Sequence, residues 1–151
     1  MKQVLYSHST SETEAIGEAL CRALLARGDT QTFVALYGEM GVGKTAFSRG
    51  FGKGLGIEHV KSPTYTVVNE HRGTPLPLFH FDMYRIQDGD DLFSIGYDDY
   101  LARKGFILCE WSEHIPDDIP ENAISVLLER TDELETRRIT IGGIQIEYSG
   151  T

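Results

Sequence analysis

The chain has 151 residues, about the length of one domain, and its 40% hydrophobic and 25% charged residues are typical of a folded globular protein rather than a disordered one. Its 14 basic and 23 acidic residues give a net charge of -9, so no direct nucleic-acid binding is expected, because the chain repels a polyanion on average. No long apolar run predicts a membrane span and the N-terminus lacks the apolar core of a signal peptide, so we expect a cytoplasmic protein without membrane contacts and one domain over residues 1–151.

The first third of the chain predicts strands and helices in alternation. A short edge strand is expected over residues 4–6, and a buried parallel strand over the apolar, β-rich residues 32–37. Apolar residues recur at helical spacing over 15–24, and Gly28 is expected to end this first helix. A second helix is predicted over residues 44–55.

The remainder predicts further strands and two short helices. The strands are expected over residues 65–69, 76–81, 106–109, 124–128 and 137–141, and the helices over 92–95 and 98–104. Turn residues between the first two of these strands predict a hairpin that ends at Asp82. The pattern as a whole indicates one α/β domain with a mixed sheet.

Residues 38–45 match the phosphate-binding pattern GxxxxGK[ST] in full, between a predicted strand and a predicted helix. Glycines let successive backbone N–H groups turn inward around phosphates, and the start of the following helix adds positive potential. Lys44 is expected to bridge the β- and γ-phosphates, and the Thr45 hydroxyl to ligate Mg²⁺. The candidate nucleotide-binding residues of the loop are Gly38, Glu39, Met40, Gly41, Val42, Gly43, Lys44 and Thr45. No guanine-reading [NT]KxD segment is present, which favours ATP.

Two predicted strands end in carboxylates, Asp82 and Glu110. Strand carboxyl ends form the ligand crevice of open α/β sheets, and hydrolysis needs a carboxylate near Mg²⁺. Either residue could be this acid, and the pattern alone does not rank them.

Other residues carry weaker signals. Thr64 lies in a proline-marked loop where P-loop proteins often keep a γ-phosphate-sensing threonine, although an ordinary turn fits equally. Trp111 follows Glu110 and is interpreted as a core residue, with stacking on the nucleotide as the functional alternative. His80, in a hydrophobic run, is predicted to be a packed histidine. Cys21 and Cys109 are predicted to be buried and to form neither a zinc site nor a disulfide.

Four blocks of the sequence together resemble the TsaE (YjeE) family of small P-loop ATPases. These blocks are residues 37–50 (YGEMGVGKTAFSRG), 61–66 (KSPTYT), 80–85 (HFDMYR) and 110–111 (EW). The resemblance implies a three-layer P-loop NTPase fold, with a mixed, mainly parallel central sheet and helices on both faces.

The resemblance also implies roles for individual residues. Thr45 and Glu110 would bind Mg²⁺, and Asp82 would be a catalytic carboxylate. Thr64 would face the γ-phosphate, and Thr10 would contact the adenine. The candidate catalytic residues are therefore Asp82, Lys44 and Thr64.

The implied activity is a Mg²⁺-dependent ATPase that is slow alone and stimulated by its partners. Those partners would be TsaD and TsaB, in threonylcarbamoyladenosine (t6A) modification of tRNA. A small-molecule kinase and a nucleotide-binding module without turnover are the alternatives, although the sequence has no arginine-dense lid of the kind kinases use. The chain lacks the glycine expected beside Arg137, so no nucleotide contact is assigned to that arginine.

Overall fold

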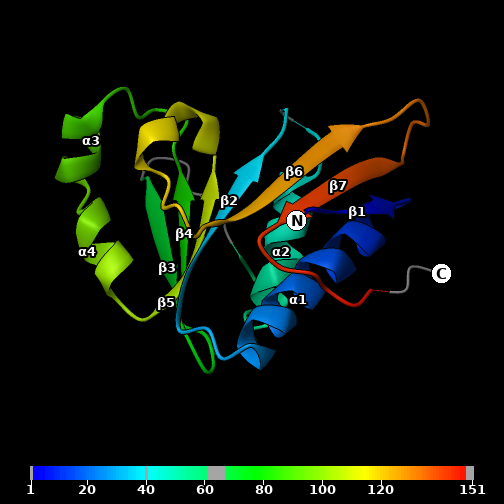
Figure 1. Ribbon diagram of the computed structural model, residues 1–151, viewed down its shortest axis with the longest axis horizontal. Helices are drawn as coiled ribbons and strands as arrows, with labels where there is room; N and C mark the ends of the chain where they lie inside the picture. The colour runs from blue at the N-terminus through cyan, green and yellow to red at the C-terminus, as the bar shows by residue number, and fades with distance from the viewer. Residues whose placement is uncertain (1, 40, 61–66, 149–151) are drawn as a thin grey trace.

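The fold is built on one mixed sheet of seven strands (Figure 1), in a computed structural model that describes residues 2–39, 41–60 and 67–148. The strand order is β1-β7-β6-β2-β5-β4-β3. The strands are β1 (Lys2–Ser7), β2 (Gln31–Tyr37), β3 (Val68–His71), β4 (Leu78–Asp82), β5 (Gly105–Glu110), β6 (Ile124–Arg130) and β7 (Arg137–Gly142). The four central strands are parallel, and antiparallel pairs extend the sheet at both edges.

Helices cover both faces of this sheet. They are α1 (Thr10–Ala26), α2 (Lys44–Lys53), α3 (Gly89–Ser94) and α4 (Tyr97–Ala102), with two 3-10 turns, η1 (Ser112–His114) and η2 (Pro116–Asp118). In Figure 1, α1 and α2 lie side by side, while α3 and α4 lie at the end of the sheet that carries β3, β4 and β5. The predicted α/β fold with a mixed sheet and helices on both faces is confirmed.

Alternate residues of the central strands pack into two separate hydrophobic cores, one on each face of the sheet. Leu78 and Leu108 pack with residues of α1 and α2, whereas Phe79 and Phe81 pack with Leu92 and other residues from the α3–α4 side. Buried parallel strands are apolar on both sides for this reason. The face that carries α1 and α2 also receives the polar side chains at the strand ends.

The crossing of α1 and α2 is close because glycines lie at the contact. A Cβ atom at Gly17 would overlap the carbonyl oxygen of Phe47, and one at Gly50 would overlap that of Glu14. Glu14 also binds Lys53 (2.7 Å) and Arg49 (3.5 Å) through its carboxylate. These contacts fix α2, and with it the preceding phosphate loop, against α1.

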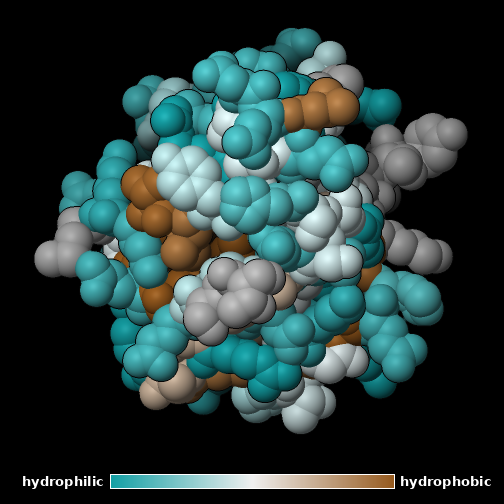
Figure 2. Space-filling model, turned by 90° about the vertical axis from the view of Figure 1, so that its right-hand side faces the viewer, coloured by the Kyte–Doolittle hydropathy of each residue, from teal (hydrophilic) through white to brown (hydrophobic). Residues whose placement is uncertain are grey.

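Every predicted strand and helix has a counterpart, with boundaries shifted by a few residues. Residues 65 and 66 of the predicted strand 65–69 lie outside the described residues. Ser9 accepts the N–H of Glu12 and so caps α1, and Gly28, at φ 88°, follows the helix end. No helix within the described ranges is long and apolar enough to cross a membrane. The side of the molecule that carries β1 and the C-terminal end is mainly hydrophilic, with a larger apolar area at the left and a smaller one at the upper right (Figure 2).

Candidate functional site

The phosphate loop leaves the carboxyl end of β2 and leads directly into α2. Gly38 (φ 145°), Gly41 (φ 75°) and Gly43 (φ 116°) adopt backbone conformations that L side chains rarely take. Gly38 is also confined by space, because a Cβ atom there would lie 2.7 Å from the carbonyl oxygen of Leu128. The glycines of the pattern are therefore required by the shape of the loop.

Lys44, the first residue of α2, is buried, with 6% of its surface exposed. Its Nζ donates to the carbonyl oxygen of Gly38 (2.7 Å) and lies 4.1 Å from the centre of the Trp111 ring. Both partners stabilise a cation, one by hydrogen bonding and one by cation–π attraction. No carboxylate of the described residues forms a salt bridge with this ammonium group, so it is in a position to bind an anionic ligand at the loop.

A pocket of about 370 Å³ opens at this end of α2. Its lining brings together six predicted site residues, Gly41, Gly43, Lys44, Thr45, Glu110 and Trp111, and also Ala46 and Arg49. Thr45 is exposed and Glu110 is buried. A hydroxyl and a carboxylate are oxygen ligands of the kind that Mg²⁺ takes, and Mg²⁺ commonly uses one or two protein ligands with phosphates and waters. The described residues contain no cluster of three or more acidic, His or Cys side chains suited to a metal, so a metal here would need ligand oxygens from a nucleotide.

The two strand-end carboxylates, Asp82 and Glu110, are register partners on the parallel strands β4 and β5. Asp82 is half-buried and accepts the backbone N–H of Tyr84 (2.9 Å). Burial is the largest cause that raises the pKa of Asp82; the Tyr84 N–H opposes the shift, and the charge of Glu110 adds to it. Asp82 does not line the pocket that holds Lys44 and Thr45.

His80 lies two residues before Asp82 on β4 and is fully buried, as predicted for a packed histidine. Its Nε2 lies 2.6 Å from Oε2 of Glu110. The sequence pattern did not predict this contact. The sequence offered one hint that His80 lies near the strand-end carboxylates. His80 and Asp82 are two residues apart, which places them on the same face of a strand.

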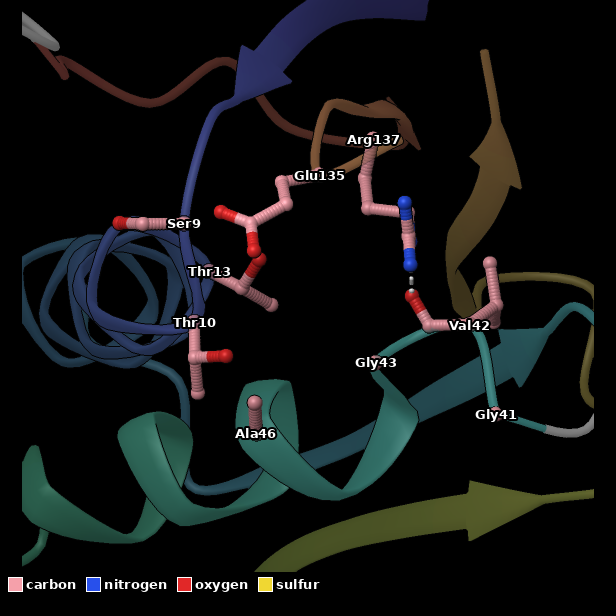
Figure 3. Close-up of a pocket in the computed structure, with 9 residues that line it drawn as sticks. All are labelled: Ser9, Thr10, Thr13, Gly41, Val42, Gly43, Ala46, Glu135 and Arg137. Carbon is pink, nitrogen blue, oxygen red and sulfur yellow. Dashed lines mark hydrogen bonds between the residues drawn. The ribbon is translucent and has the colours of Figure 1, made fainter. Parts of the chain in front are cut away.

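A second cavity, of about 230 Å³, adjoins the other side of the loop (Figure 3). Its walls come from the start of α1, the loop and the start of α2, and the residues next to β7. The lining residues are Ser9, Thr10, Thr13, Gly41, Val42, Gly43, Ala46, Glu135 and Arg137. In Figure 3, the side chain of Arg137 reaches the loop, where its Nε donates to the carbonyl oxygen of Val42 (3.0 Å). Because Gly41, Gly43 and Ala46 line both pockets, the two cavities meet at the phosphate loop.

Arginines of the β6–β7 hairpin bracket the loop. Arg130 and Arg137 are register partners, and Arg130 Nη1 donates to Oε2 of Glu39 (3.1 Å) while Arg137 binds Val42. Neither contact was predicted from the sequence, because nothing in the spacing of residues 130 and 137 places them at a loop some 90 residues earlier.

Trp111 packs against the phosphate lysine and two other ring systems. Its backbone lies at φ 58°, the one positive value for a non-glycine residue within the described ranges. Its ring lies 5.0 Å from that of Tyr84 and 5.4 Å from that of His114. Trp111 is only partly buried, so it lines the site as well as packing against its neighbours.

Gly38 and Glu39 line a third, more open pocket of about 730 Å³, with Trp111 and Tyr37.

Two candidate residues, Met40 and Thr64, lie outside the described residues.

Cys21 and Cys109 are buried free thiols, as predicted. Burial raises the pKa of each to about 12, so both are inert at neutral pH.

A family model described as "Threonylcarbamoyl adenosine biosynthesis protein TsaE" matches residues 7–139. The protein named tRNA threonylcarbamoyladenosine biosynthesis protein TsaE in Bacillus subtilis (strain 168) is 36% identical over 150 residues, which are 98% of this chain and 90% of that protein. The protein of the same name in Treponema pallidum (strain Nichols) is 35% identical over 123 residues, or 81% of this chain and 87% of that one.

A solved structure has the same fold. The crystal structure of YdiB from Bacillus subtilis superimposes with a TM-score of 0.78 at 29% sequence identity, covering 93% of this chain and 84% of that one. The family model alone spans the phosphate loop and both strand-end carboxylates, Asp82 and Glu110.

Proposed function

This chain belongs to the TsaE family, and from that premise we propose that it is a Mg²⁺-dependent ATPase that acts in tRNA threonylcarbamoyladenosine (t6A) biosynthesis. The observation that carries the proposal is the pocket at the start of α2, where a complete phosphate loop, Lys44, Thr45 and Glu110 meet. We further propose that the protein works in the cytoplasm and acts through the partner proteins TsaB and TsaD.

Lys44 and the loop backbone would bind the triphosphate. The Lys44 ammonium would exchange the Gly38 carbonyl and the Trp111 ring for phosphate oxygens, which are stronger partners because they are charged. The N–H groups at the start of α2, with the helix dipole, would hold the β-phosphate. Glu39 and Val42 belong to the described part of the loop, and Trp111 would cover the phosphates on the β5 side.

Thr45 and Glu110 would hold Mg²⁺ between the protein and the nucleotide. When bound, the ion neutralises charge on the β- and γ-phosphates. The Thr45 hydroxyl is exposed to the pocket and the Glu110 carboxylate is part of its wall, so these oxygen ligands suit the ion.

Asp82 would orient or deprotonate the attacking water, with Thr64 at the γ-phosphate. Asp82 lies at the same strand end as Glu110 but outside the wall of the phosphate pocket. This offset supports slow turnover by the protein alone, because the water-positioning group stands apart from the phosphates until a partner closes the site.

The cavity of Figure 3 would take the adenosine. It meets the phosphate pocket at Gly41 and Gly43 and contains Thr10. Arg137 and Glu135 would line the nucleoside from the β7 side. An adenosine in this cavity leaves its triphosphate directed along the loop toward Lys44.

Phosphate release from Mg·ATP, measured with this protein alone and then with purified TsaB and TsaD, tests the function. We expect slow release alone, stimulation by the two partners, and loss of the stimulation in Asp82→Ala. Transfer of phosphate to a metabolite would point to a kinase instead. Bound ATP without release, even with both partners, would indicate a nucleotide-binding module.

A further inference from the structure

We propose that His80 is a positioning residue for the metal site, acting through its hydrogen bond to Glu110. The inference rests on the proposed function, because it concerns the carboxylate that would ligate Mg²⁺. His80 itself does not line the phosphate pocket, whereas Glu110 does.

The geometry joins a buried imidazole to a carboxylate at the edge of the pocket. His80 Nε2 and Glu110 Oε2 are 2.6 Å apart, a short distance typical of a hydrogen bond with a charged partner. The His80 side chain is fully buried and that of Glu110 is 10% exposed. An ionised Glu110 offers only acceptors, so Nε2 must carry the proton of this bond.

The hydrogen bond from His80 occupies one carboxylate oxygen of Glu110 and leaves the second oxygen to bind a metal ion. Oε2 accepts from His80, while Glu110 remains a lining residue of the pocket. A glutamate has three side-chain torsions, and fixing the far oxygen removes rotamer freedom that metal binding would otherwise have to restrict. Hydrogen-bonded partners of metal ligands typically change metal affinity by about 10- to 100-fold when removed.

The strand arrangement makes this pair possible. His80 stands opposite Leu108 in the parallel β4–β5 ladder, and Glu110 is two residues further along β5, on the same face. The imidazole therefore reaches diagonally toward the strand end, where the phosphate loop lies. A histidine of this kind is more than a packed core residue, because its polar atom determines the orientation of a residue at the pocket.

The test compares metal binding by variants of His80 at equal nucleotide occupancy. ADP-saturated protein is titrated with Mn²⁺, and free Mn²⁺ is followed by electron paramagnetic resonance. His80→Leu removes the donor at similar volume, whereas His80→Gln can place an amide N–H near the position of Nε2. We expect His80→Leu to weaken Mn²⁺ binding by about 10- to 100-fold and His80→Gln to restore most of it. ADP binding in EDTA should change by less than about twofold, since His80 is not a lining residue of either pocket that meets at the loop.

Leu78→Ala is the matched control, because Leu78 is a fully buried residue of the same strand and face. It should lower stability and leave Mn²⁺ affinity unchanged. If His80→Leu does not fold, His80→Asn serves in its place, because its amide ends one bond short of Nε2.

Equal Mn²⁺ affinity in wild type and in the donor-free variants would overturn the inference, as would an equal loss in Leu78→Ala. A wild-type ADP complex that binds no Mn²⁺ would overturn the metal assignment as well. The two failures are distinct, because only the second appears in the unmodified protein. In a Glu110→Ala background, removing His80 should have no further effect on Mn²⁺ affinity, and an undiminished effect there would also contradict the proposal.

Discussion

Asp82 and Glu110 stand opposite each other at the carboxyl ends of β4 and β5, yet only Glu110 lines the phosphate pocket. Their polar partners differ as well. Glu110 binds the imidazole of His80, while Asp82 accepts the backbone N–H of Tyr84. Two carboxylates that are equivalent in the sequence pattern therefore occupy different environments, and their substitutions should have different effects.

Glu110→Ala should weaken Mg²⁺-dependent ATP binding, because it removes a carboxylate that lines the pocket with Thr45. We expect a loss of about 10-fold or more in the Mg²⁺-dependent part of the affinity, measured by titration with and without the metal. Binding in EDTA should be nearly unchanged. Equal Mg²⁺ dependence in wild type and Glu110→Ala would rule out the metal role.

Asp82→Ala should bind Mg·ATP about as well as wild type and lose partner-stimulated hydrolysis. The reason is that Asp82 lies beside the pocket rather than in its wall, so it contributes little to ground-state binding. Removing a general base or water-positioning group typically costs about 10²- to 10⁴-fold in rate. Stimulated phosphate release that persists in Asp82→Ala would assign the water to another group.

Lys44→Ala should abolish measurable nucleotide binding. Its buried ammonium binds the Gly38 carbonyl of the loop, and each hydrogen bond to a charged group contributes about 1.5–3 kcal/mol, or roughly 10- to 150-fold in affinity. Lys53→Ala is the control, because Lys53 lies at the other end of α2 and binds Glu14. An equal loss in both variants would show that the effect is one of folding.

Arg137→Ala should weaken nucleotide binding by about 10-fold, because Arg137 lines the cavity beside the loop and holds the Val42 carbonyl. Arg138→Ala is a close control, since Arg138 is the next residue on β7 and pairs with Glu129 instead. Calorimetric titration with ADP would compare the two. Unchanged affinity in Arg137→Ala would agree with the sequence analysis, which assigned this arginine no contact.

The parts of the molecule that follow from local pattern could be predicted from the sequence. Alternation of apolar strands with helical spacing identified every described strand and α-helix but neither 3-10 turn, and the GxxxxGK[ST] pattern placed Lys44 and Thr45 at a helix start. The two apolar strands that end in Asp82 and Glu110 indicated that both carboxylates would lie at one edge of the sheet. The register of β4 and β5 confirms this. These inferences need only the chain's own periodicity.

The contacts between distant segments could not be predicted in this way. Arg137 reaches Val42 because β7 is placed next to β6, and β6 next to β2, an order that local spacing does not encode. The pairing of His80 with Glu110 also depends on which strands are neighbours and on their register. For the same reason, the sequence pattern did not show whether Asp82 or Glu110 is the carboxylate near Mg²⁺.

An ion pair between Glu14 of α1 and Lys53 of α2 helps to fix the phosphate-loop helix against α1. The hydrogen bond from Lys53 is the largest cause that lowers the pKa of Glu14; burial opposes the shift, and the charges of Lys53 and Arg49 reinforce it. A carboxyl with a lowered pKa in the folded state stabilises the protein above its ordinary pKa of 4.5, and this contribution disappears as the pH falls through the lowered value.

Glu14→Gln should therefore lower the melting temperature near neutral pH by about 2–4 °C, which corresponds to roughly 1 kcal/mol for a chain of this length. The difference should shrink as the pH falls below 4.5 and through the lowered pKa of Glu14, because wild type then loses the same charge. Glu18→Gln is the control on the same helix, because its partner Arg22 is two-thirds exposed and the pair lies within α1 alone, so we expect a smaller change. High salt should reduce the Glu14 effect, since Lys53 is half exposed. A melting difference that stays constant from neutral to acidic pH would show that the loss comes from packing rather than from the ion pair.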